Sequence, residues 1–329
     1  MDKILVIRYG TIGDTIFASA FYRELRKNLP NAQIDVLVDG VAESIMLNCP
    51  YINNLIKLKK KYRDFFYYYK LFKNYDTIFF LKNDNFLSKV AFLARVKNRI
   101  GFDVRRNFRL TKTAPYKNNK HEIDFYLDLL KVCGYKVEND KTEMWVSPSE
   151  KVEETVNNRS GKNVLIHASS RFPQKNWNKA NWAKVIEYLA GEKSANIFFV
   201  GGNSDNEYYS GIEFSNADIN SKVINLCGMY NIQETMSLVS KMDLVLGIDS
   251  GVIHMAAASD IPSILLNGPT SLVRWQPRSE KCTVLTKNYE CSPCMFASSR
   301  NKRCKNKAAE CMEAITYDEV INAINNVLI

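Results

Sequence analysis

The sequence predicts an α/β protein built from two doubly wound, Rossmann-like domains that face each other across a cleft. Short apolar runs alternate with helical segments of about ten residues in both halves of the chain, which is typical of parallel sheets covered by helices. One polar, charged stretch, residues 147–162, interrupts this alternation and is the best candidate for a linker with an exposed helix. A chain of 329 residues also fits about two domains. We therefore expect one domain over residues 1–155 and a second over residues 156–329.

The first β-α-β unit lies at the N-terminus. Residues 4–7 form a continuous apolar run of the kind buried in parallel sheets. Residues 15–28 carry apolar positions at helical spacing and stop before Pro30, and residues 34–38 read as the next strand. Further strands of the same sheet are expected at residues 77–81 and 99–102.

The second half repeats this pattern. Strands are expected at residues 164–166, 196–200, 222–226, 244–248 and 263–266, with helices at residues 181–189, 232–240 and 252–258. Ligands of open α/β sheets bind outside the carboxyl ends of the strands, so the loops that follow these strands are the candidate site.

Composition excludes several classes of protein. Apolar residues make up 46% of the chain, as in ordinary globular proteins. No uncharged apolar window is long enough for a transmembrane helix. The N-terminal apolar run is only a strand long and is broken by Arg8, so it does not resemble a signal peptide. We expect a cytoplasmic protein, whose eight cysteines are thiols or metal ligands rather than disulfides.

The positive charge is concentrated in one block. The chain carries a formal net charge of +10, but residues 57–120 contain 18 basic and 4 acidic residues, a net of +14. Tyrosines and phenylalanines interleave this block. Such a surface attracts polyanions, namely nucleic acid, anionic lipid headgroups or a phosphorylated glycolipid. The alternative is a solvated lysine face over core aromatics.

Two loops of the second half have the chemistry of an anion site. Residues 247–254, GIDSGVIH, lead from a buried strand into an alanine-rich helix, so Ser250 and Gly251 fall where helix amides point outward unpaired. The alternative is a simple N-cap with a spacing glycine, and His254 alone is more often structural. Residues 167–171, HASSR, together with Lys175 form a plausible diphosphate cradle.

The loop after the first strand, RYGTIGD over residues 8–14, is neither a G-x-G-x-x-G fingerprint nor a Walker A loop. It offers the carboxylate of Asp14, held by glycine turns, although Asp14 also fits a first-turn helix acid. No Asp-x-Asp pair occurs in the chain, so a nucleotide-sugar site clamped by a divalent metal has no obvious ligands.

Four cysteines lie close together near the C-terminus. Cys291 and Cys294 form a C-x-x-C pair, and Cys304 and Cys311 follow singly. Four thiols at this spacing are a partial match to a structural zinc site. The alternative is that they pack as reduced thiols.

Four segments in order give the chain a family resemblance: KILVIRYGTIGDTI, HASSRFPQKNWNKANWAKVI, LVLGIDSGVIHMAAASDIPSILLNGPT, and the cysteine cluster before a last helix. The chain resembles glycosyltransferase family 9, the ADP-heptose:lipopolysaccharide heptosyltransferases with the GT-B fold. The resemblance implies an inverting, metal-independent transferase that needs no cofactor. It also implies an N-terminal domain for an anionic glycolipid acceptor and a C-terminal domain for a nucleotide-sugar donor.

The resemblance also assigns roles to residues. Asp14 matches the proposed catalytic base, and Gly13 beside it is expected on the acceptor side. Arg105 and Arg106 of the basic block are expected to bind the phosphate and acidic-sugar groups of the acceptor. A further acidic donor contact would be Asp205 or Glu207. The expected donor-binding residues are Ser169, Ser170, Lys175, Asp249, Ser250, Gly251 and His254. We expect peripheral contact with the inner membrane surface from the cytoplasmic side, and no nucleic-acid partner.

Three alternatives stay open. The first is a GT-B relative with another sugar donor or a sugar-nucleotide epimerase. The second is a nucleic-acid-binding protein built from the basic block and a zinc-ribbon-like tail, although such a protein has no need for glycine-rich loops at several sheet ends. The third is an inactive scaffold, against which the presence of Asp14 and Lys175 argues.

Overall fold

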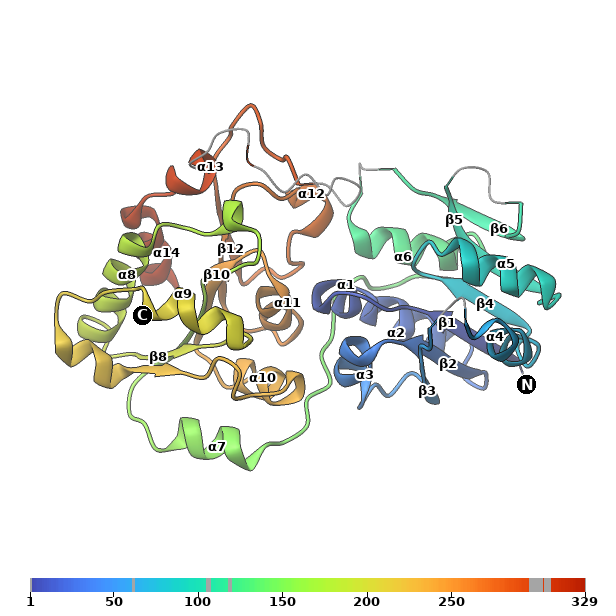
Figure 1. Cartoon of the computed structure of the whole chain (residues 1–329), viewed down its shortest axis with the longest axis horizontal. Coiled ribbons are helices and arrows are strands. Elements are labelled where there is room, and N and C mark those ends of the chain that lie inside the picture. The colour runs from blue at the N-terminus through green and yellow to red at the C-terminus, as the bar shows by residue number, and fades with distance from the viewer. Residues whose placement is uncertain are drawn as a thin grey trace. The chain divides into compact units, whose positions relative to one another are not determined.

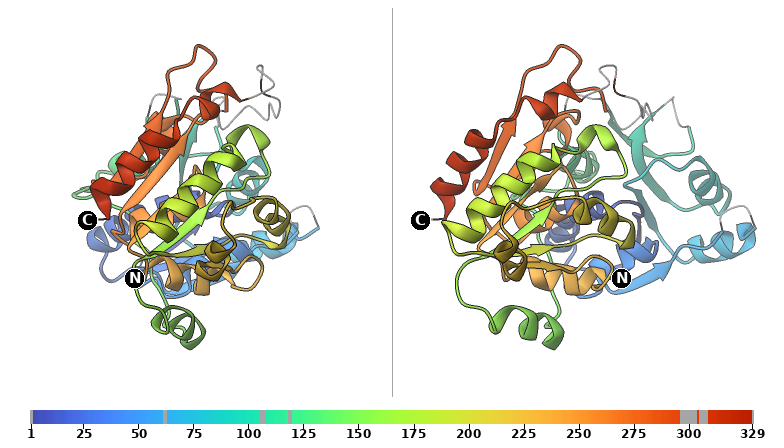
Figure 2. Two further views of the ribbon diagram at one scale, coloured as in Figure 1. Left: turned by 90° about the vertical axis from the view of Figure 1, so that its left-hand side faces the viewer. Right: turned by 60° about the vertical axis from the view of Figure 1, so that its left-hand side comes forward.

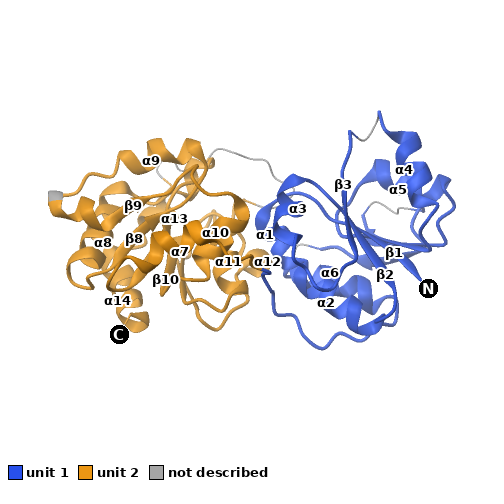
Figure 3. Ribbon diagram, turned by 90° about the horizontal axis from the view of Figure 1, so that it is seen from below, with its two compact units in different colours: residues 1–145 blue, residues 146–329 orange. Residues whose placement is uncertain are grey.

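A computed structural model describes residues 2–60, 63–104, 108–117, 120–295, 304 and 309–328. The chain divides into two compact units, residues 1–145 and 146–329 (Figure 3). This boundary lies ten residues before the one expected from the sequence. The reason is helix α7 (Glu150–Asn157), which buries Val152 and Val156 and packs against α10 (Ile232–Val239) of the second unit.

The first unit contains one six-stranded sheet in the order β3-β2-β1-β4-β5-β6, and every neighbouring pair is parallel (Figure 1). The order reverses between β1 and β4, which makes the carboxyl ends of these two strands the switch point of the sheet. The strands are β1 (Lys3–Ile7), β2 (Gln33–Val38), β3 (Asn54–Lys57), β4 (Thr77–Phe80), β5 (Asn98–Asp103) and β6 (Lys112–Pro115).

The helix expected over residues 15–28 is instead two helices, α1 (Ile12–Phe17) and α2 (Ser19–Asn28), separated at Ala18. The first begins earlier than expected because the side chain of Thr11 accepts a hydrogen bond from the amide of Asp14 and caps it. The remaining helices of this unit are α3 (Gly40–Met46), α4 (Phe65–Phe72), α5 (Asn85–Leu93) and α6 (Glu122–Lys131).

Both faces of this sheet are covered. On one face, Leu5 and Ile7 of β1 share a buried cluster with Tyr68 of α4 and Leu87 of α5. On the other face, Phe79 of β4 meets Phe21 of α2 edge to face, with 5.3 Å between ring centroids. Alternate strand residues therefore point to opposite helix layers, as in a doubly wound domain.

The second unit repeats the architecture with the sheet order β12-β11-β10-β7-β8-β9, again all parallel. Its switch point lies between β7 and β10. Each strand expected in this half is confirmed to within two residues at each end. The strands are β7 (Asn163–His167), β8 (Asn196–Phe199), β9 (Val223–Asn225), β10 (Leu244–Ile248), β11 (Ser263–Asn267) and β12 (Cys282–Thr286).

Helices α8 (Lys179–Gly191) and α14 (Tyr317–Val327) pack against each other over this second sheet (Figure 2). None of the helices in the described part of the chain has the length and apolar character needed to span a bilayer. The other helical segments of the unit are η1 (Pro173–Lys175), η2 (Asn203–Asp205), α9 (Asn206–Ser210), η3 (Ala217–Lys222), α11 (Gly251–Ala258), α12 (Leu272–Trp275) and α13 (Glu310–Glu313).

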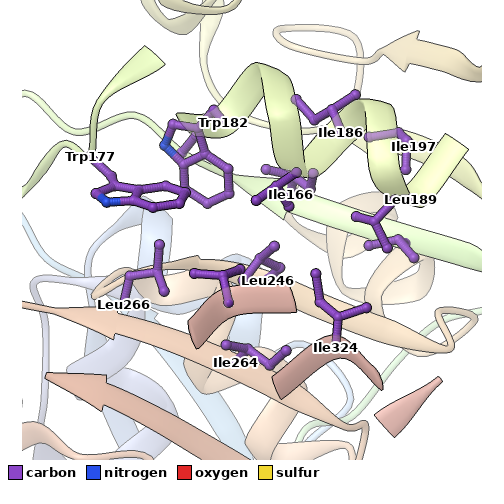
Figure 4. Packing of buried hydrophobic residues seen from close by; sticks show 14 of the residues in the cluster. Ile166, Trp177, Trp182, Ile186, Leu189, Ile197, Leu246, Ile264, Leu266 and Ile324 are labelled. Carbon is purple, nitrogen blue, oxygen red and sulfur yellow. The ribbon is translucent and has the colours of Figure 1, made fainter. Parts of the chain in front are cut away.

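The core beneath α8 and α14 anchors the loop that follows β7. Trp177 and Trp182 are fully buried and meet edge to face at 5.2 Å (Figure 4). The indole of Trp177 donates a hydrogen bond to the carbonyl of Ile315 at 2.9 Å, so its one polar group is paired. Because Trp177 stands two residues after Lys175, this packing fixes the position from which Lys175 extends.

Candidate functional site

Asp14 lies in the first turn of α1, directly after β1 at the switch point of the first sheet. Thr11 donates its hydroxyl to Oδ2 of Asp14 at 2.8 Å, and Arg8 Nη2 lies 3.0 Å from the same oxygen. No hydrogen bond or ion pair within the described residues reaches Oδ1. The Asp14 side chain is 30% exposed. One carboxylate oxygen is therefore held in place while the other is available to a ligand.

Arg8 is a candidate site residue that the sequence interpretation missed, because it contacts the Asp14 carboxylate. Arg8 directly follows the last residue of β1 and is buried. Its Nε donates a hydrogen bond to the Asp14 carbonyl at 3.3 Å, and its Nη1 donates one to the Tyr9 carbonyl at 2.7 Å. The guanidinium also lies 5.6 Å from the ring centroid of Tyr126 on α6. A buried cation requires a partner, so an arginine that breaks an apolar strand was the available signal for a nearby carboxylate.

The carboxyl end of β4, the other strand at this switch point, adds a second polar group. Lys82 donates to the Tyr9 carbonyl at 3.3 Å and stacks 4.2 Å from the centroid of the Tyr9 ring. The Tyr9 hydroxyl in turn donates to Asp84. Gly10 has a φ of +133°, and a Cβ there would lie 3.2 Å from Lys82 Nζ, so only glycine allows this approach without strain.

The expected acceptor-side residues have different outcomes. Gly13 lies in α1 immediately before Asp14 and is partly exposed. Arg105 and Arg106 lie outside the described residues. The idea that glycine turns hold Asp14 needs correction, because Asp14 is a helical residue positioned by Thr11 and Arg8.

Lys175 and Asp249 meet at the switch point of the second sheet. Lys175 Nζ donates to Asp249 Oδ2 at 2.7 Å and to the Asp249 carbonyl at 3.1 Å, and both side chains are largely buried. Lysine carries three N–H donors, so these two contacts leave one free to turn toward a ligand. Gly247 permits this close packing of β7 and β10, since a Cβ there would lie 2.6 Å from the His167 carbonyl.

Asp249 also contacts the next helix. Its Oδ1 lies 3.6 Å from Nε2 of His254 on α11. Burial by itself raises the pKa of Asp249, but Lys175 and His254 outweigh burial and hold that pKa well below its ordinary value. Asp249 is therefore a carboxylate throughout the physiological range and keeps Lys175 in place.

The start of α11 has the features of an anion-binding site. Ser250 is the N-cap residue in extended conformation, but its side chain makes no capping hydrogen bond. Its buried Oγ has no hydrogen-bond partner among the described residues. The helix begins at Gly251, and its first amides carry the positive end of the helix dipole. A buried hydroxyl that has no partner in the described part of the chain, beside these amides, makes this helix start a candidate site for a ligand that accepts a hydrogen bond.

The loops after β7 and β8 also converge. The Ser169 hydroxyl donates to Oδ1 of Asp205, and Oδ2 of Asp205 accepts from the Gly202 amide at 2.6 Å. Ser170 instead accepts a hydrogen bond from the Phe172 amide at 3.1 Å within its own turn. Of the two acidic residues left open, Asp205 is the one that reaches the β7 loop, whereas Glu207 is exposed on α9.

The cysteine cluster borders the loop after β11. A Cβ on Gly268 would lie 2.8 Å from Cys311 Sγ, and the Cys294 amide donates to the Pro269 carbonyl at 3.0 Å. Burial, and then the neighbouring thiols of Cys294, Cys291 and Cys304, raise the pKa of Cys311 to about 11. In the described part of the chain, no group of three or more His, Cys, Asp or Glu side chains is arranged to hold a metal ion.

The chain matches a known protein family over most of its length. The family described as glycosyltransferase family 9 (heptosyltransferase) matches residues 70–305. Lipopolysaccharide heptosyltransferase 1 of Campylobacter coli is 26% identical over 296 residues, which cover 83% of this chain and 85% of that protein.

Two solved structures share the fold over nearly the whole chain. A family 9 glycosyltransferase from Veillonella parvula superposes with a TM-score of 0.84 at 20% identity, covering 100% of this chain and 98% of that one. The E. coli ADP-heptose lps heptosyltransferase II gives a TM-score of 0.78 at 21% identity, covering 99% and 98%. The expected pair of Rossmann-like domains with a GT-B fold is thereby confirmed. The chain belongs to glycosyltransferase family 9 and is a glycosyltransferase.

Proposed function

We propose that the protein transfers a heptose from ADP-heptose to a lipopolysaccharide core acceptor, with inversion at the anomeric carbon. The observation that carries the proposal is that each sheet of this family 9 glycosyltransferase bears reactive groups at its switch point. These are the Asp14 carboxylate in the first unit and the Lys175, Asp249 and Ser250 group in the second. The names of the similar proteins, which are lipopolysaccharide heptosyltransferases, support the choice of sugar and acceptor.

The second unit supplies the donor site. The amides at the start of α11, the Ser250 hydroxyl and the remaining N–H of Lys175 bind the diphosphate of the donor. When the bond between the anomeric carbon and the diphosphate breaks, negative charge grows on the departing ADP. Fixed donors stabilise that charge, each by about 3–4 kcal/mol when well placed. Asp205 and Ser169 lie at the neighbouring strand ends and complete the polar wall of this site.

The first unit supplies the base. Oδ1 of Asp14, the carboxylate oxygen left without a partner among the described residues, accepts the proton of the acceptor hydroxyl. The hydroxyl oxygen then forms a bond to the anomeric carbon as the bond to the diphosphate breaks, so the products are the glycosylated acceptor, ADP and a protonated Asp14. General-base assistance of this kind contributes roughly 10²–10⁴ in rate.

The proposed reaction needs neither a metal nor a cofactor. Lysine and helix amides perform the charge stabilisation that a divalent ion performs in other nucleotide-sugar enzymes. The acceptor is an anionic glycolipid, which fits the basic block over residues 57–120 and contact with the inner membrane surface from the cytoplasmic side. Nucleic acid is not a partner in this proposal.

The test is a donor panel followed by a transfer assay. The purified protein is mixed with ADP-heptose, a UDP-hexose and a GDP-hexose, and thermal melting reports binding. ADP-heptose at 100 times its dissociation constant should add about 2.7 kcal/mol to the free energy of unfolding. With a truncated lipopolysaccharide core, ADP release should match a mass increase of one heptose on the acceptor.

Asp14→Asn tests the base. We expect it to bind ADP-heptose as the wild type does and to lose at least about 10² in turnover. Asp76→Asn is the matched control, because Asp76 precedes β4 at the opposite end of the same sheet and should leave turnover unchanged. Full turnover in Asp14→Asn would refute the base assignment, and melting shifts with a UDP-hexose alone would refute the donor.

A further inference from the structure

The first unit exposes a small group of apolar side chains that the proposed chemistry does not use. Phe92 and Leu93 end α5, and Phe108 lies between β5 and β6. Their exposed fractions are 41%, 43% and 75%. Grouped apolar side chains that stay exposed on a soluble protein mark an interaction surface more often than isolated ones do.

Two arginines complete the group. The rings of Phe92 and Phe108 meet edge to face with centroids 6.0 Å apart. Arg99 Cζ lies 5.6 Å from the centroid of Phe92, and Arg109 Cζ lies 5.2 Å from that of Phe108. These five residues, Phe92, Leu93, Arg99, Phe108 and Arg109, are called the arginine–phenylalanine patch.

The surroundings of the patch are strongly basic. Residues 85–112 contain eight basic residues and one acidic residue, Asp103. Lys89, Arg95, Lys97 and Lys112 are exposed, and no ion pair within the described residues joins any of these four to a carboxylate. The patch therefore belongs to a basic segment in which four exposed cations have no carboxylate partner among the described residues.

We propose that the arginine–phenylalanine patch docks the protein onto a membrane surface that contains anionic lipids. Aromatic rings and leucine partition into the boundary between headgroups and acyl chains, and arginine and lysine nearby bind lipid phosphates. Each basic residue near an anionic surface adds to the attraction, and salt screens it.

The chemistry favours a membrane over nucleic acid. Single-stranded nucleic acid needs aromatic faces that are free to stack on bases, whereas here Phe92 and Phe108 pack edge to face with a guanidinium beside each ring. Leu93 has no role in such stacking but suits a lipid boundary. The inference rests on the proposed function, because the proposed lipid-linked acceptor is embedded in the membrane that the patch would contact.

The test is co-sedimentation of the full chain with vesicles. The wild type should bind vesicles of phosphatidylcholine mixed with phosphatidylglycerol, should bind pure phosphatidylcholine at least about tenfold more weakly, and should be released by salt. The double variant Phe92→Ser, Phe108→Ser should bind the mixed vesicles about tenfold more weakly than the wild type. Leu47→Ser is the matched control, because Leu47 is 62% exposed at the end of α3 and lies outside the basic segment.

A charge variant completes the set. Lys97→Glu should weaken binding to the mixed vesicles, whereas Lys184→Glu, on the exposed side of α8, should not. Equal binding by the wild type and the double serine variant would overturn the inference, as would a serine effect seen only on self-association or on DNA binding. Asp14→Asn should bind vesicles normally, so failure of the docking surface and failure of the proposed base give different results.

Discussion

Arg8 and Asp14 form an ion pair at the carboxyl end of β1, with Arg8 almost inaccessible to solvent and Asp14 partly exposed. The guanidinium contacts the Asp14 carbonyl as well as its carboxylate, so it fixes both the start of α1 and the orientation of the side chain. Arginine suits this role because its planar fork presents several donors in one rigid geometry. Arg8 therefore acts on the proposed base without needing to touch a substrate.

Replacing Arg8 should reduce turnover more than binding. Arg8→Gln keeps a polar side chain but removes the charge and the fork, and we expect kcat to fall about 10²-fold because a misplaced carboxylate accepts the proton of the acceptor hydroxyl poorly. The KM for the donor should stay unchanged, since the proposed donor contacts belong to the second unit. Arg8→Lys should recover part of the loss. Steady-state rates with both substrates provide the measurement.

A double-mutant cycle separates positioning from plain destabilisation. If Arg8 acts through Asp14, Arg8→Gln should cause no further loss of kcat when Asp14 is already asparagine. Equal losses in both backgrounds would mean that Arg8 supports the fold and not the base. Thermal melting of each variant shows whether enough folded protein is present for the comparison.

Much of the fold could be predicted from the sequence because buried parallel strands are continuous apolar runs. β7, β8, β10 and β11 are read directly in this way. β3 and β6 were missed because they lie at sheet edges, where NLIK and KTAP mix polar residues with apolar ones. The boundary between the compact units lies ten residues before the expected one, because a polar segment looks like a linker even when two buried valines hold its helix in place.

The candidate site was predictable where strand ends carry unusual residues, as at Ser250 and Lys175. The contacts between loops at neighbouring strand ends were not predictable, because they depend on which strands pair and in which register. Nothing local to residues 203–207 says that Asp205, rather than Glu207, reaches Ser169. Similarly, Lys82 becomes part of the Asp14 region only because β4 lies beside β1.

Breaking the Lys175 and Asp249 pair should impair donor binding. Lys175→Met removes the cation that we propose binds the diphosphate, and we expect kcat/KM to fall about 10²–10³-fold with weaker ADP binding. Asp249→Asn should also weaken ADP binding, because Lys175 loses the group that orients it. Calorimetric titration with ADP is the measurement. Lys184→Met is the control, and weakening by the control to the same extent would contradict the assignment.

His167 should make stability depend on pH. Burial lowers the pKa of its ring, whose Nδ1 has no hydrogen-bond partner among the described residues. The unfolded chain, with a histidine pKa of about 6.5, therefore binds more protons than the folded chain below that pH. Stability from a neutral His167 is complete above about pH 6.5 and is lost as the pH falls, by at most about 1.4 kcal/mol per pH unit. Melting curves of His167→Asn should decline less in acid than those of the wild type, and parallel curves would contradict this.

Chelation should separate catalysis from any role of the cysteines. If Lys175 and the α11 amides carry the charge of the leaving diphosphate, dialysis against a chelator should leave kcat and donor binding unchanged, and added Mg²⁺ or Mn²⁺ should not raise the rate. A metal held by Cys291, Cys294, Cys304 and Cys311 would appear in elemental analysis, and its removal would lower the melting temperature, because structural metal binding contributes to folding. Both effects are compatible with the proposed reaction. A rate that disappears on chelation and returns with Mg²⁺ or Mn²⁺, at constant melting temperature, would contradict it and would move the stabilisation of the leaving ADP from Lys175 to a metal ion.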